Sequence, residues 1–190
     1  MTNFDFLKKI PEFQVFADAA VSAELMLHID VDACVISCRR AMEFAIKWMF
    51  SIDKDLKMPH NDSLVCLLED EDFAAIVGKD MLRRLEYIRK IGNKAAHGED
   101  KVVKQQAELC LENLFEFLDF VAYCYHKNYK EREFDRKLLE LTLEEVLDFV
   151  TEDVDLQTLR EQNESNREEF TARRNRHCST YVARPYSDEF

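Results

Sequence analysis

Apolar side chains recur at spacings of three and four residues through residues 11–127 of the chain. Because an α-helix turns once in about 3.6 residues, these spacings place apolar side chains on one helix face. The clearest such face comprises Val35, Cys38, Met42, Ala45, Ile46 and Met49. On this basis, helices are predicted over residues 11–28, 32–52, 62–68, 70–77, 79–97 and 100–127.

Helix-start and helix-stop residues lie at several of these boundaries. Pro11 suits the first turn of a helix, where its missing N–H is not needed, and Asp32 is the predicted N-cap of the second helix. Gly98 is the predicted C-terminal cap of the helix over residues 79–97, in the left-handed conformation that glycine favours. Thr142 and Glu145 form a predicted capping box before a further apolar run.

These elements predict an all-α protein, an antiparallel helical bundle of four to five main helices with a protruding C-terminal helix. The chain has only 3 Gly and 3 Pro, which leaves little room for the tight turns of a β-sandwich or barrel. Residues 1–153 are expected to form the bundle domain. Residues 154–190 are expected to form a polar C-terminal helix and a connector toward a missing downstream domain.

The charge is strongly acidic but unevenly distributed. A formal net charge of −12 opposes nonspecific contact with phosphate backbones over most of the surface. Residues 171–184, in contrast, hold four Arg and no acid. We interpret Arg173, Arg174 and Arg176 as candidate nucleic-acid-binding residues, through which the chain contacts DNA. The alternative is a solvated helix end, whose cations complement the helix dipole.

The 6 cysteines include no C-x-x-C pair, and most lie inside apolar runs. Neither a signal peptide nor an apolar stretch of membrane-spanning length is visible, so a cytoplasmic protein without a membrane partner is expected. Cys34 and Cys38 share a helix face, but a zinc site needs two more ligands that no spacing supplies. We therefore predict core thiols and no metal site.

Arg89, Asn93 and His97 are the candidate catalytic residues. Four positions apart on a predicted helix, they share one face, where a guanidinium, an amide and an imidazole can bind a phosphate and move a proton. The favoured alternative is structural: inter-helix hydrogen bonds from Arg89 and Asn93, with His97 at the helix end. Neither a Ser-His-Asp arrangement nor a nuclease carboxylate cluster is visible, and three Gly, at 78, 92 and 98, exclude a Walker-type loop.

Residues Ile88–Gly98 resemble the end of the third helix in the HEPN superfamily. Several members of that superfamily are ribonucleases that use an Arg and a His four to six residues apart, usually across a dimer interface. The resemblance therefore also allows a homodimer. Here seven residues separate Arg89 from His97, and each added residue turns a helical side chain by about 100°. The pair therefore need not converge on one phosphate.

A second resemblance is to the N-terminal region of type I restriction enzyme R subunits. It is carried by Asn3–Leu7, Cys38–Glu43, Ile88–His97 and Ser179–Pro185. It implies the accessory head of a DNA-translocating ATPase and endonuclease, with modification and specificity subunits as partners. The stop at Asp188-Glu189-Phe190 then agrees with a truncated chain. ATP and Mg²⁺ are implied for the parent enzyme, and no cofactor is expected in this part.

Three functions are therefore considered for the chain. The first is an accessory domain in DNA restriction that contributes subunit or DNA contacts. The second is a free-standing, metal-independent ribonuclease using Arg89, Asn93 and His97. The third is a non-catalytic protein-interaction bundle. Because acid–base pairs at workable spacing are missing, we predict that the domain itself cleaves neither DNA nor RNA.

Overall fold

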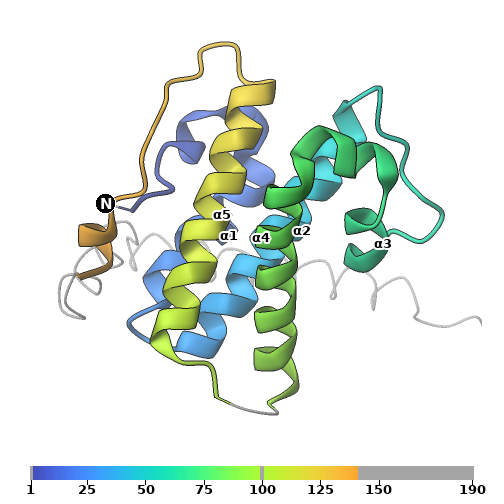
Figure 1. Cartoon of the computed structure of the whole chain (residues 1–190). Helices are drawn as coiled ribbons and strands as arrows, with labels where there is room; N and C mark the ends of the chain where they lie inside the picture. Colours follow the sequence, from blue (N-terminus) through green and yellow to red (C-terminus); the bar gives the residue numbers. More distant parts are fainter. Residues whose placement is uncertain (1, 99–100, 141–190) are drawn as a thin grey trace, which may run out of the picture. The chain divides into compact units, whose positions relative to one another are not determined.

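The computed structural model describes residues 2–98 and 101–140, and over these residues the protein contains helices and no strands (Figure 1). The all-α prediction is confirmed. The elements in chain order are η1 Leu7–Lys9, η2 Pro11–Phe13, α1 Gln14–Met26, α2 Val31–Ile52, α3 Leu64–Leu68, α4 Glu71–His97, α5 Lys104–Tyr125 and η3 Arg136–Glu140. The capping box at Thr142, the boundary after residue 153 and the arginine-rich stretch lie outside the described residues.

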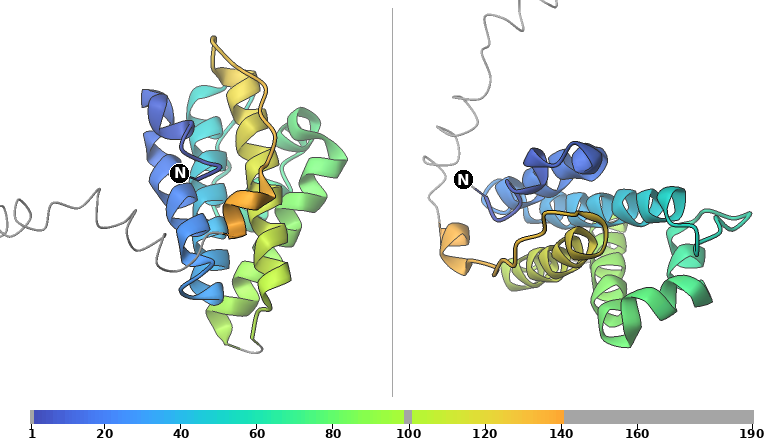
Figure 2. Two further views of the ribbon diagram at one scale, coloured as in Figure 1. Left: turned by 90° about the vertical axis from the view of Figure 1, so that its left-hand side faces the viewer. Right: turned by 90° about the horizontal axis from the view of Figure 1, so that it is seen from above.

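Helices α1, α2, α4 and α5 form the bundle, and successive long helices run in opposite directions (Figures 1 and 2). Helix α2 packs against α1, α4 and α5, and α4 also packs against α5. The short helix α3 lies against α4. This arrangement leaves one side of α4 facing away from the core.

The core is built from the predicted apolar faces and from a cluster of aromatic rings. Trp48, half-buried, makes edge-on contacts with Phe13, Phe16 and Tyr125 at ring-centroid distances of 5.2, 5.8 and 5.5 Å. Each such pair stabilises the fold by about 0.5–1.5 kcal/mol beyond its burial. Trp48 therefore joins α2 to α5 and to the start of α1.

The N-cap of α2 is Asp30, so the prediction of Asp32 was wrong by two residues. The Asp30 carboxylate accepts hydrogen bonds from the backbone N–H groups of Asp32 (2.9 Å) and Ala33 (3.1 Å). Asp32 instead accepts a bond from the backbone N–H of Val102 at 3.3 Å. Both residues are Asp, which caps helices well, and the tertiary contact of Asp32 with residue 102 decides their roles.

Glycine interrupts and ends α4 as the sequence predicts. Gly78 has φ 78° and ψ 164°, which divides α4 into two segments, and Gly98 has φ 65° at the C-terminal cap. An L side chain at either angle is strained, whereas glycine adopts it freely. The segment Lys79–His97 is therefore a separate straight helix with a defined end.

Helix α5 is shorter than the predicted 100–127. The apolar spacing along this segment predicts that Val103 and Cys124 face inward, but both are exposed. Val103 occupies the N-cap position of α5, before the regular helical rotation begins. Periodicity also carries no information about where the neighbouring helices stop covering α5, so it could not predict the exposure of Cys124 near its C-terminal end.

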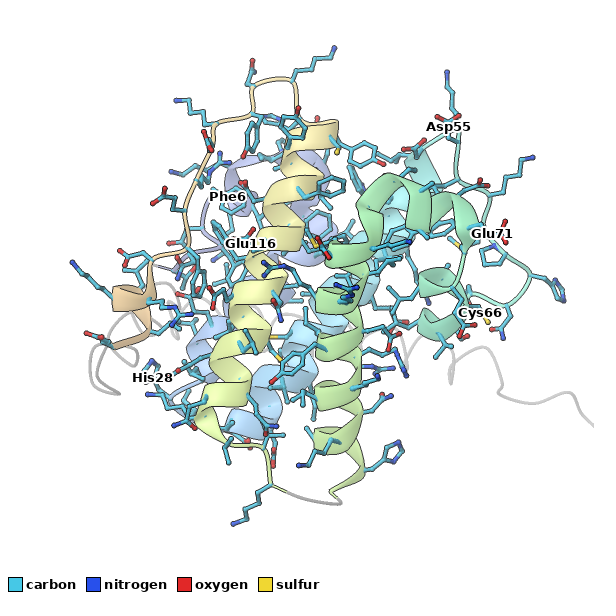
Figure 3. All side chains as sticks on the ribbon, viewed as in Figure 1. Phe6, His28, Asp55, Cys66, Glu71 and Glu116 are labelled. Carbon is cyan, nitrogen blue, oxygen red and sulfur yellow. The ribbon has the colours of Figure 1, made fainter. Side chains whose placement is uncertain are left out.

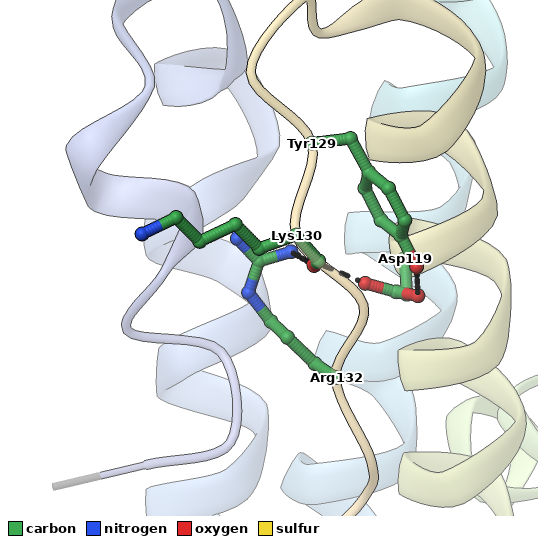
Figure 4. A network of polar contacts seen from close by, with 4 residues as sticks. All are labelled: Asp119, Tyr129, Lys130 and Arg132. Atoms are coloured by element: carbon green, nitrogen blue, oxygen red, sulfur yellow. Dashed lines mark hydrogen bonds and ion pairs between the residues drawn. The ribbon is translucent and has the colours of Figure 1, made fainter.

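The segment after α5 is held by a polar network around Asp119 (Figure 4). The Tyr129 hydroxyl donates to Asp119 Oδ2 at 2.6 Å, and this bond raises the pKa of Tyr129 to about 12. Arg132 Nη1 donates to Asp119 Oδ1 at 3.4 Å and to the Lys130 carbonyl at 2.6 Å. The Arg132 guanidinium also lies 4.1 Å from the ring centroid of Phe6. The network thereby connects α5, the following segment and the N-terminal region.

Asn3, which is bound by the buried carboxylate of Glu24, joins the two ends of the described chain. The Asn3 backbone N–H donates to both Glu24 oxygens (3.1 and 3.0 Å), and Asn3 Nδ2 donates to Oε1 at 3.1 Å. The Asn3 side chain also exchanges hydrogen bonds with the backbone of Asp135 (3.2 and 2.8 Å). Burial raises the pKa of Glu24 from 4.5 to about 7, against the hydrogen bonds from Asn3, which lower it.

Candidate nucleic-acid interface on helix α4

The predicted catalytic residues Arg89, Asn93 and His97 all lie on α4, on successive turns. Arg89 and Asn93 are half-buried, and His97, the last residue of the helix, is exposed. With a rise of 1.5 Å per residue, the eight steps from Arg89 to His97 separate their Cα atoms by about 12 Å along the axis. The three residues thus follow one another along α4, but the first and the last are far apart.

The Arg89 guanidinium is bound by Glu86 on the same helix. Arg89 Nε donates to Glu86 Oε1, and Nη2 donates to Oε2, both at 3.0 Å. The bond to Glu86 raises the pKa of Arg89. Because Glu86 precedes Arg89 by almost one turn, the guanidinium is directed along α4 away from His97. The predicted inter-helix hydrogen bond of Arg89 is therefore wrong, and the Arg–His pair does not converge within one chain.

Gly92 allows α2 and α4 to approach closely. A Cβ atom at this buried position would lie 2.8 Å from both Cβ and Cδ of Arg39 on α2, closer than carbon atoms normally pack. The aliphatic stem of Arg39 thus lies across Gly92. Its Nε is buried and has no hydrogen-bond partner in the described part of the chain.

The helical spacing of Glu43 from Arg39 and Arg40 predicts an ion pair with one of them, but Glu43 pairs with Lys47 instead. Lys47 Nζ lies 3.1 Å from Glu43 Oε1 and 3.1 Å from an Asp62 carboxylate oxygen, so Lys47 forms ion pairs with both carboxylates. The Arg40 guanidinium instead lies 5.2 Å from the centroid of the Phe44 ring. Arg39 therefore lies against α4, and Arg40 against Phe44 of its own helix, while Glu43 pairs with Lys47.

The second segment of α4 is basic. Lys79–His97 contains six Lys or Arg and two acids, Asp80 and Glu86, so its formal charge is 6 − 2 = +4 in a protein of −12. Spacings of three, four and seven residues put most of these cations on the side that turns away from the core. We define the α4 basic face by Lys79, Arg83, Lys90, Lys94 and His97. It extends about 27 Å along the helix.

Three cations of this face, Lys79, Arg83 and Lys90, are only weakly neutralised. Arg83 pairs with Asp80 at 3.1 Å, but both side chains are largely exposed (79% and 93%), where ion pairs contribute little. Lys79 and Lys90 are exposed and form no ion pair with any residue of the described ranges. These charges therefore remain available to an anionic partner.

Helix α5, beside α4, has the opposite charge. It contains one Lys and four acids, a formal charge of 1 − 4 = −3. Glu108, Glu112 and Glu116 recur every fourth residue, and Glu116, labelled in Figure 3, is exposed. A polyanion is thus attracted to α4 and repelled by the adjacent helix, which restricts its position on the surface.

A groove opens between α3 and α4. Its volume is about 480 Å³, and it is lined by Leu68, Glu69, Leu82, Arg83, Glu86, Tyr87 and Lys90. Two of these residues, Arg83 and Lys90, belong to the α4 basic face, so the groove adjoins that face. Figure 3 shows the side chains of this region, with Cys66 of α3 labelled.

Sequence reasoning did not identify the α4 basic face. In the net charge of −12, acids on other helices outweigh the +4 of residues 79–97 and conceal it. A sum over each predicted helix separately would have found it. The predicted DNA-binding residues Arg173, Arg174 and Arg176 lie outside the described residues, so their role stays a prediction.

Within residues 2–98 and 101–140, no group of three or more His, Cys, Asp or Glu side chains is placed to hold a metal ion. No helix in the same ranges is long and apolar enough to cross a membrane.

In comparisons with known proteins, the domain of unknown function DUF4145 matches residues 21–141, which is 121 of 190 residues. No curated protein and no solved structure matches the chain significantly.

Proposed function

The chain belongs to the family of the domain of unknown function DUF4145, and we propose that it is a helical accessory domain that binds DNA through the α4 basic face. The observation that carries this proposal is the charge of +4 on Lys79–His97 in a protein of −12. Lys and Arg side chains that contact phosphates supply the sequence-independent part of DNA affinity. The domain performs no chemistry of its own.

The geometry of the Arg–Asn–His row supports a non-catalytic role. A general acid or base must lie within hydrogen-bond reach of the proton it transfers. Arg89 is bound by Glu86, and His97 lies two turns further along α4. One phosphate cannot meet both side chains within a single chain unless the Arg89–Glu86 pair opens.

The resemblance to type I restriction R subunits supplies the biological setting of the proposal. In that setting the domain contributes to DNA restriction, and its partners are the modification and specificity subunits. The ATP- and Mg²⁺-dependent steps belong to the parent enzyme. A DNA backbone that lies along the 27 Å face meets a row of about three available cations.

The salt dependence of DNA binding tests the proposal. If three cations contact phosphates, the affinity for a short fluorescent duplex falls roughly 40-fold between about 50 and 200 mM salt. The triple variant Lys79→Gln, Arg83→Gln and Lys90→Gln should lose most of this affinity and most of its salt dependence, measured by fluorescence anisotropy. Circular dichroism checks that the variant stays helical.

A matched control carries the same loss of charge away from α4. Lys8, Lys9 and Lys104 are exposed and lie in η1 and at the start of α5, so their triple change to Gln should leave duplex binding within about threefold of the wild type. Equal losses in the two triple variants would show that total charge, and not the α4 basic face, governs binding. Absence of salt-dependent binding by the wild type would also refute the proposal.

A further inference from the structure

The groove between α3 and α4 has the size of a small-ligand site. Its volume of about 480 Å³ falls within the roughly 300–1,000 Å³ of known ligand pockets. Its lining includes Leu68, which is almost fully buried, and the half-buried Leu82 and Tyr87. The groove can therefore cover a flat apolar group on one side.

Tyr87 offers an aromatic surface in this groove. Its ring makes none of the ring contacts found among the residues that the structure describes. Its hydroxyl, whose ordinary pKa is about 10, is neutral at pH 7, and partial burial raises that pKa further. An unstacked nucleobase stacks well on such a ring, because every base presents a π-face.

The polar residues at the groove suit the rest of a nucleotide. Arg83 and Lys90 place two cations there, where a phosphate would neutralise them. Glu69 and Glu86 supply carboxylate oxygens, which accept hydrogen bonds from exocyclic amino groups such as N4 of cytosine. Glu86 already binds Arg89, whereas Glu69 is exposed. Glu69 is thus the better acceptor for a base.

We propose that the groove between α3 and α4 holds one unstacked base of a DNA strand whose phosphates lie on Arg83 and Lys90. Cytosine is preferred over thymine, because thymine has no exocyclic amino group to donate to Glu69. This inference rests on the proposed binding of DNA by the α4 basic face and specifies its substrate. The domain then binds single-stranded or locally opened DNA more tightly than a duplex, where all bases are stacked and paired.

Anisotropy titrations at one salt concentration test the groove with three probes of equal length: oligodeoxycytidine, oligothymidine and a duplex. The wild type should prefer the strands over the duplex and oligodeoxycytidine over oligothymidine. Tyr87→Leu should weaken strand binding roughly tenfold and leave duplex binding unchanged. Tyr87→Phe, which keeps the ring, is the matched control and should bind like the wild type.

A second variant does not depend on the half-buried tyrosine. Glu69 is exposed, so Glu69→Gln should fold normally and reduce the preference for oligodeoxycytidine over oligothymidine. An iodinated cytosine in the strand should also photo-crosslink to the peptide that contains Tyr87. If the wild type binds the duplex but neither Tyr87→Leu nor Glu69→Gln changes strand binding, the proposed base site in the groove is refuted. DNA binding by the α4 basic face would then still be supported. Absence of binding to all three probes would overturn both.

Discussion

The buried carboxylate of Glu24 makes the stability of this protein depend on pH in a direction that can be worked out. Burial raises the pKa of Glu24 from 4.5 to about 7 in the folded protein. The folded state therefore binds the proton more tightly than the unfolded state does. The resulting stabilisation is fully present below pH 4.5 and is lost as the pH rises through 7.

The size of the effect follows from the shift. The difference between 4.5 and about 7 is about 2.5 pKa units, and one unit corresponds to about 1.4 kcal/mol, so the free energy of unfolding should fall by about 3 kcal/mol across this range. Glu24→Gln cannot ionise, and its amide oxygen can still accept a hydrogen bond from Asn3. The variant should lack this decline, so its stability relative to the wild type should rise by about 3 kcal/mol from low to neutral pH.

Urea unfolding followed by circular dichroism, at pH values from about 4 to 8, measures both curves. Other titrating groups are common to the two proteins and cancel in the difference between them. Glu12 is exposed in η2, so Glu12→Gln is the matched control and should run parallel to the wild type. A constant difference between wild type and Glu24→Gln at every pH would refute the reasoning.

Three further substitutions test how α2 is positioned. Gly92→Ala places a Cβ 2.8 Å from Arg39 Cβ and Cδ, so overpacking of about 1–3 kcal/mol should outweigh the gain in helix propensity of up to about 1 kcal/mol. A variant more stable than the wild type in urea unfolding would disprove the close approach. Asp30→Ala should lower stability by about 1 kcal/mol, as loss of an N-cap does. Asp32→Ala should lower it by less, and a reversed order of the two thermal midpoints would contradict the assignment of the cap.

The helices themselves could be predicted from local spacing. The apolar positions of α2 and α5 recur on one face, and Gly78 and Gly98 mark a break and an end that the backbone angles bear out. Such features depend on residues within about one turn of one another, and the sequence displays these neighbours directly. The resemblance to restriction subunits stays a prediction, because the family that matches has no known function.

Which polar side chains bind one another was decided only by the tertiary structure. Glu24 meets Asn3 across 21 residues, and Asn3 meets Asp135 across 132. The groove beside the α4 basic face exists because α3 returns against α4, which no periodicity reveals. Even Arg89 and Glu86, three residues apart, were not predicted as a pair, because several partners lie within reach of a long side chain. Periodicity determines which face of a helix is buried, whereas the packing of distant helices determines which polar groups meet.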